Sequence, residues 1–135
     1  MKLQLAILAQ GTSTDRFSNR LSIFNLIERI EASTFPFLIP EAAFVIVLRR
    51  ESNEPSQFDT EILVRLGDVV VAKANTHIDF EDKFGARHIV NFQGFPVFNP
   101  GELTFQFGLP GGEVIQASVP VVQQETTPPN VQAAH

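Results

Sequence analysis

Hydrophobic and polar residues alternate along much of the chain with a period of two, which is the pattern of half-buried β-strands. Near the N-terminus, Leu3, Leu5, Ile7 and Ala9 share one parity and predict a first strand. Similar runs recur about every 8–12 residues, with turn-forming residues between them. We therefore predict an all-β fold, a single antiparallel β-sandwich of the immunoglobulin-like or Greek-key type with about eight strands. The further predicted strands cover 21–27, 43–50, 59–66, 69–75, 87–95, 103–107 and 114–122.

Two segments, 43–50 and 68–74, are more hydrophobic than a sheet with one buried face needs. Either a loop or helix covers the second face, or that face is a surface for self-assembly. The pattern does not decide between these two interpretations. On the second one, the candidate interface residues are Val45, Val47, Val69 and Val71.

The segment NPGELTFQFGLPGGEVI, residues 99–115, has glycines and prolines that fit either a ligand-gripping loop or a β-sheet corner. Phosphate-binding loops place their glycines between a strand and a helix. Here the glycines lie between predicted strands, and no lysine follows them. We therefore predict that Pro100–Gly101 turns the chain into the next strand, and that Gly111–Gly112 supplies positive φ angles for the last hairpin.

This corner carries a family resemblance. RHIVNFQGFPVFNPGELTFQF and the upstream LSIFNLIERIEASTFPFLIPEAAFVIVLR resemble an uncharacterised bacterial family of short proteins, a domain of unknown function. The resemblance covers residues 1–123, and it implies a β-sandwich without any known activity. Leu103 stands where the family pattern has a corner tyrosine, and Ile39 replaces a histidine. The positions that match the pattern are Phe24, Asn25, Phe35, Pro36, Pro40, Asn91, Pro100, Gly101 and Phe105.

Length and composition narrow the organisation further. The 135 residues predict one β-sandwich domain over 1–123, followed by a flexible tail over 124–135 in which Pro128 and Pro129 could serve as a docking arm. The net charge of −5 disfavours binding to nucleic acid and to anionic membranes. No apolar run reaches the ~20 residues of a membrane span. The absence of cysteine is compatible with a cytoplasmic protein.

Residues suited to metal binding are few. His77 and Asp79 have the spacing of neighbours on one strand face, and His88 could approach them across a hairpin. His77, Asp79 and Asp82 are thus weak candidates for a metal site, and the acidic stretch 79–82 could hold Ca²⁺.

No serine lies in a nucleophile elbow. Glycoside hydrolysis by paired carboxylates stays open, but the chain lacks the tryptophan and tyrosine of sugar platforms. We predict no enzyme activity and no cofactor.

The function that we expect is that of a non-catalytic binding or structural protein. It would form homo-oligomers with a second copy, or bind a protein partner as an accessory, decoration-type component of a larger bacterial or phage assembly. Its location would then be cytoplasmic, or virion-associated if a phage encodes it. The alternative is a cytosolic ligand- or Ca²⁺-binding module that uses the acidic loop, and a hydrolase is the third hypothesis.

Overall fold

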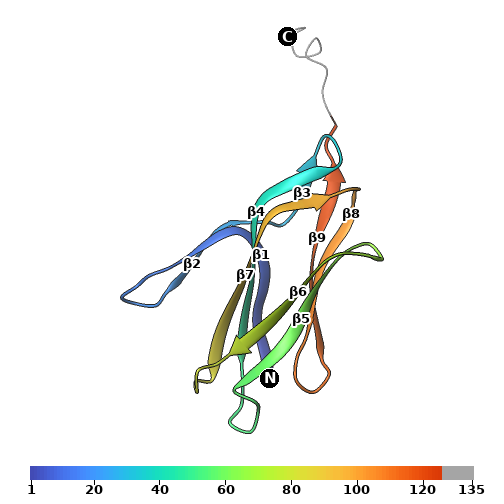
Figure 1. The fold of residues 1–135 in the computed structure, drawn as a ribbon. Helices are drawn as coiled ribbons and strands as arrows, with labels where there is room; N and C mark the ends of the chain where they lie inside the picture. The colour runs from blue at the N-terminus through green and yellow to red at the C-terminus, as the bar shows by residue number, and fades with distance from the viewer. Residues whose placement is uncertain (126–135) are drawn as a thin grey trace.

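A computed structural model describes residues 1–125, and within this range the chain is all-β, as the alternation predicts (Figure 1). It contains nine strands rather than about eight. The additional strand, β3, is only three residues long and lies between the predicted strands 21–27 and 43–50. The strands are β1 (Lys2–Thr14), β2 (Leu21–Leu26), β3 (Ile30–Ala32), β4 (Phe37–Arg49), β5 (Gln57–Leu66), β6 (Val69–Asp79), β7 (Gly85–Val97), β8 (Gly101–Gly108) and β9 (Val114–Gln123).

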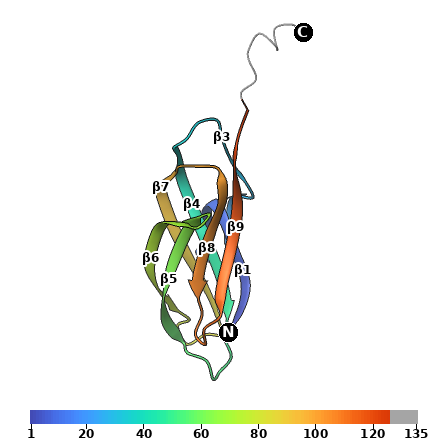
Figure 2. The same ribbon diagram turned by 90° about the vertical axis from the view of Figure 1, so that its right-hand side faces the viewer.

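The strands form two sheets that lie face to face (Figure 2). One sheet has four strands in the order β2-β1-β4-β7, and the other has five in the order β3-β9-β8-β5-β6. The sequence predicted purely antiparallel pairing, and this is wrong at one place. β3 pairs in parallel with the end of β9, from Ile30 opposite Val121 to Ala32 opposite Gln123. Local periodicity does not reveal the direction of a partner that lies so far away in the chain.

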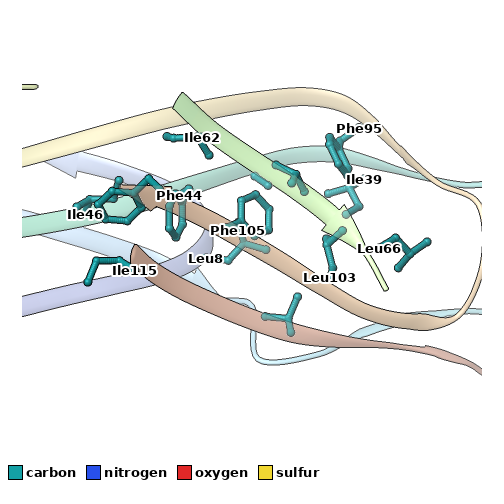
Figure 3. Close-up of a cluster of buried hydrophobic side chains, with 14 of the residues drawn as sticks. Leu8, Ile39, Phe44, Ile46, Ile62, Leu66, Phe95, Leu103, Phe105 and Ile115 are labelled. Atoms are coloured by element: carbon teal, nitrogen blue, oxygen red, sulfur yellow. The ribbon is translucent and has the colours of Figure 1, made fainter. Parts of the chain in front are cut away.

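Both sheets contribute side chains to one hydrophobic core (Figure 3). The ring of Phe44 on β4 has no exposed surface. It stacks on Phe105 of the other sheet, with ring centroids 5.1 Å apart, and meets the edge of Phe107 at 6.0 Å. Phe92 on β7 meets Phe105 edge-on at 5.6 Å. A cluster of phenylalanine rings therefore joins the two layers.

In both β4 and β7, the residues that face the core change between odd-numbered and even-numbered positions at one shared place. Ile39 and Ala42 both belong to the core, although strict alternation would put residues three apart on opposite faces. The change falls at Pro40 on β4. The corresponding position on β7 is Gly94, which has a φ angle of 62°. With this bend, the proline-containing segment continues directly into β4, which begins at Phe37 rather than at the predicted residue 43.

The glycine-rich segment near the C-terminus forms a turn, as predicted. Gly111 and Gly112 have φ angles of 97° and 95° and connect β8 to β9. The Leu109 amide donates to the Glu113 carbonyl at 2.7 Å, which closes this turn. The segment after strand β8 therefore redirects the backbone and leads into another strand rather than a helix.

Candidate functional site

The hairpin formed by the second half of β1 and by β2 projects away from the five-stranded sheet (Figure 1). β1 changes partner along its length, because Lys2–Ala9 pairs with β4 and Ala9–Thr14 pairs with β2. The hairpin therefore separates from the rest of its sheet beyond Ala9. We call residues 10–26 the arm.

Asp15 builds the turn at the end of the arm. Its carboxylate accepts hydrogen bonds from the backbone amides of Phe17 at 2.8 Å and Ser18 at 2.9 Å. The Asn19 amide donates to the Asp15 carbonyl at 2.9 Å, and the Asp15 amide donates to the Arg20 carbonyl at the same distance. The hydrogen bonds to the carboxylate lower the pKa of Asp15 because they favour its charged form. The turn is thus closed by its own polar groups.

This hydrogen-bonded turn exposes hydrophobic side chains. Phe17 at its tip is 94% exposed, and Phe24 and Leu26 on β2 are 51% and 50% exposed. These three are among nine large hydrophobic residues that are exposed within residues 1–125. Single exposed apolar residues are ordinary, but a concentration of them on one projecting element is typical of an interaction surface.

The turn of the arm also reaches the outer face of the four-stranded sheet. Arg87 on β7 donates from Nη2 to the carbonyl of Asn19 at 2.7 Å. Arg87 pairs with Val47 of β4, and Val45 lies two residues further along the same face. Val45 has no exposed surface and Val47 is half-buried. A covered outer face therefore explains why β4 is apolar on both sides, and Val45 is not accessible to a partner as the interface hypothesis required.

The other predicted interface residues have different surroundings. Val69 is 65% exposed at the start of β6, and its neighbour Val70 is 44% exposed. Val71 is half-buried and packs against the core. Pro128 and Pro129 lie outside the described residues. Val69 is thus the accessible member of the predicted β6 pair.

The two histidines of the predicted metal site do not converge. His77 lies on the exposed face of β6, where Nδ1 bonds Asp59 at 2.7 Å and Nε2 bonds Gln57 at 3.0 Å. His88 on β7 bonds the hydroxyl of Thr76 instead. Burial, followed by the charge of His77, lowers the pKa of His88. His88 therefore bridges the two sheets at one side of the molecule.

The acidic stretch forms a tight turn that uses one of its own carboxylates. Asp79 accepts a hydrogen bond from the Glu81 amide at 2.8 Å, and the Lys83 amide donates to the carbonyl of buried Phe80 at 2.9 Å. Glu81 and Asp82 have φ angles of 52° and 63°. Across residues 1–125, no three His, Cys, Asp or Glu side chains are grouped in a way that could hold a metal ion.

These features define a two-layered all-β protein with a projecting hydrophobic arm. The chain belongs to a family of unknown function, DUF6941, whose family model matches residues 4–122. This confirms the resemblance to a domain of unknown function. No curated protein and no solved structure matches the chain significantly. The described part of the chain has no helix with the length and hydrophobicity that a membrane crossing requires.

Sequence reasoning does not select the exposed residues of the arm. Phe24 enters only as part of the family pattern, and the composition around Phe17 predicts a plain loop. A usable signal is the sequence TDRFSN, in which a lone phenylalanine stands between the turn formers Asp15 and Asn19. An aromatic residue in such a turn has no neighbouring core position to enter.

Proposed function

We propose that this protein is non-catalytic and works by self-association, either alone or as an accessory component of a larger assembly. The observation that carries this proposal is the arm, in which a turn held by Asp15 presents Phe17 almost entirely to water. Burying a phenylalanine ring stabilises an interface by about 1.5–3 kcal/mol. An aromatic anchor of this kind, on a preorganised turn, loses little conformational entropy when it binds.

The electrostatics of residues 1–125 support a non-catalytic role. Three groups have clearly shifted pKa values, namely Asp15, Glu54 and His88. The pKa of Asp15 is lowered by hydrogen bonds from backbone amides, and that of Glu54 is lowered by the N-terminal amine and then by the Glu51 amide. His88 bonds the hydroxyl of Thr76, and the hollow that Thr76 lines is open to solvent rather than an enclosed cleft. Catalytic groups usually combine a shifted pKa with a cleft that holds substrate.

We also propose that the two sheets have the immunoglobulin-like or Greek-key type of connectivity. The support is the path of the chain after the β5–β6 hairpin, since β7 crosses to pair with β4 and β8 then returns to pair with β5. A cytoplasmic or virion-associated location is part of the same proposal, supported by the lack of cysteine.

Light scattering coupled to size-exclusion chromatography tests the functional proposal. The full chain, with a protomer mass of 15.0 kDa, is expected to elute as an oligomer whose population rises with concentration. Phe17→Ser should shift the population toward the monomer. Phe84→Ser is the matched control, because Phe84 is 56% exposed but lies outside the arm. A shortened chain that lacks residues 124–135 shows whether the tail contributes. A strict monomer at every concentration would overturn the proposal.

A further inference from the structure

Exposed sheet edges invite pairing with another chain, and most edges of this protein carry features that oppose it. β3 is only three residues long and contains Glu31. The edge strands β6 and β7 contain charged residues, Lys73 and Arg87 respectively. β2 is different, since the segment Leu21–Leu26 has neither a charged residue nor a proline. Within the described chain, β2 pairs with β1 on one side only.

The paired part of β2 is longer than its six residues. The Asp15 amide donates to the Arg20 carbonyl at 2.9 Å, and the Ile27 amide donates to the Leu8 carbonyl at 2.8 Å. The chain therefore runs alongside β1 from Arg20 to Ile27. Its other edge has no partner within the described chain, and it is regular over Leu21–Phe24, up to the change of backbone direction at Asn25.

We propose that β2 pairs antiparallel with β2 of a second copy, with Phe24 on the two-fold axis. This inference rests on the proposed self-association and names its interface. In a continuous sheet, two residues that lie directly opposite each other point to the same face. When a strand pairs with its own copy, the numbers of two opposed residues are therefore both odd or both even. With Phe24 opposite itself, Ser22 lies opposite Leu26 of the second copy. One step further out, Arg20 lies opposite Glu28 of the second copy.

The charges of Arg20 and Glu28 favour this register over the registers in which the two strands are shifted. Arg20 and Glu28 are both exposed, and neither takes part in an ion pair within residues 1–125. In the proposed dimer, Arg20 of each copy forms an ion pair with Glu28 of the other, so one such pair lies at each end of the interface. With Ile23 on the axis, Arg20 would face Leu26 and Glu28 would face a serine. With Asn25 on the axis, Arg20 would face an isoleucine.

The apolar residues of the arm agree with this arrangement. Phe24 and Leu26 are each about half exposed, and they point to the same side of β2. Pairing at Phe24 places the two Phe24 side chains next to each other on the outer face of the joined sheet, with one Leu26 two residues away on either side. Asn25, with φ 52°, puts a local twist into the edge beside Leu26, while Leu21–Phe24 on the other side is regular. The result is a closed dimer in which two four-stranded sheets become one of eight strands.

Charge reversal tests the partners of Arg20. Arg20→Glu is expected to weaken the dimer by about tenfold, because it turns both ion pairs into repulsive contacts. Glu28→Arg should weaken it similarly, and the double variant should restore wild-type association. Arg16→Glu is the matched control, since it makes the same change of charge in the turn. Sedimentation velocity over a concentration series measures each equilibrium.

Engineered cysteines test the register directly, because the natural chain has none. In the proposed dimer, Ser22→Cys mixed with Leu26→Cys should form a disulfide, since opposed Cα atoms lie about 4.5–5.5 Å apart. Ser22→Cys alone should not, because its two copies are four residues apart along the strands, about 13 Å. Association without these effects of charge and cross-linking would overturn the β2 interface and leave self-association standing. A chain that is monomeric throughout would overturn both proposals.

Discussion

Replacing Phe44 with alanine is expected to remove a large part of the stability of the fold. The side chain is completely buried between the sheets and contacts Phe105 and Phe107 of the opposite layer. Truncation of a buried phenylalanine typically lowers the free energy of unfolding by about 3–5 kcal/mol. The two aromatic contacts place Phe44→Ala in the upper half of that range, at about 4 kcal/mol. Since a domain has about 5–15 kcal/mol in total, the variant should be marginal.

Urea unfolding followed by circular dichroism in the far ultraviolet measures this loss. The chain has no tryptophan or tyrosine, so intrinsic fluorescence offers no strong signal. With a urea dependence of about 2 kcal/mol per molar, the midpoint should fall by about 2 M. Phe17→Ala is the control, because a ring that is 94% exposed should change stability by no more than about 0.5 kcal/mol. A loss below about 1 kcal/mol for Phe44→Ala would refute a core that the two sheets share.

Three further predictions concern titration and backbone geometry. Because burial and His77 lower the pKa of His88, stability should be full above the unfolded pKa of about 6.5 and should fall as the pH drops toward the folded pKa. His88→Gln should remove the part of this stability loss that comes from protonation of His88. Urea unfolding at several pH values measures the difference. Asp15 should titrate below its ordinary pKa when its carboxyl is followed by nuclear magnetic resonance, and Asp15→Ala should speed amide hydrogen exchange at Phe17 and Ser18. Gly111→Ala should cost about 1–2 kcal/mol in thermal or urea unfolding, because φ is 97° there. Gly108→Ala, where an added Cβ has open space and φ is not positive, should cost little by comparison.

The fold class was predictable because each strand encodes its own two-residue period. The strands predicted over 59–66 and 69–75 are present as β5 and β6, which form a hairpin with Gly67 in its turn at φ 59°. The parallel partner of β3 and the parity change at Pro40 were not predictable. Both depend on a distant strand, β9 for the first and Gly94 on β7 for the second.

The candidate surface was harder to predict than the fold. The apolar pattern of β4 correctly indicated that both of its faces are buried, but it gave no sign that the turn of the arm contacts Arg87 beside that face. Val45 was therefore a reasonable interface candidate from sequence, because its burial depends on how distant segments pack and is seen only in the structure. Exposure of Phe17 likewise depends on the direction in which the hairpin projects.

Hydrogen–deuterium exchange of the full chain at increasing protein concentration tests the central claim most directly, because it reports on the arm without any substitution. Amides of residues 20–27 should become more protected as the concentration rises, while those of the β6 edge, 69–79, should exchange at a constant rate. Exchange in 20–27 that is fast and independent of concentration would contradict an arm that binds a second copy.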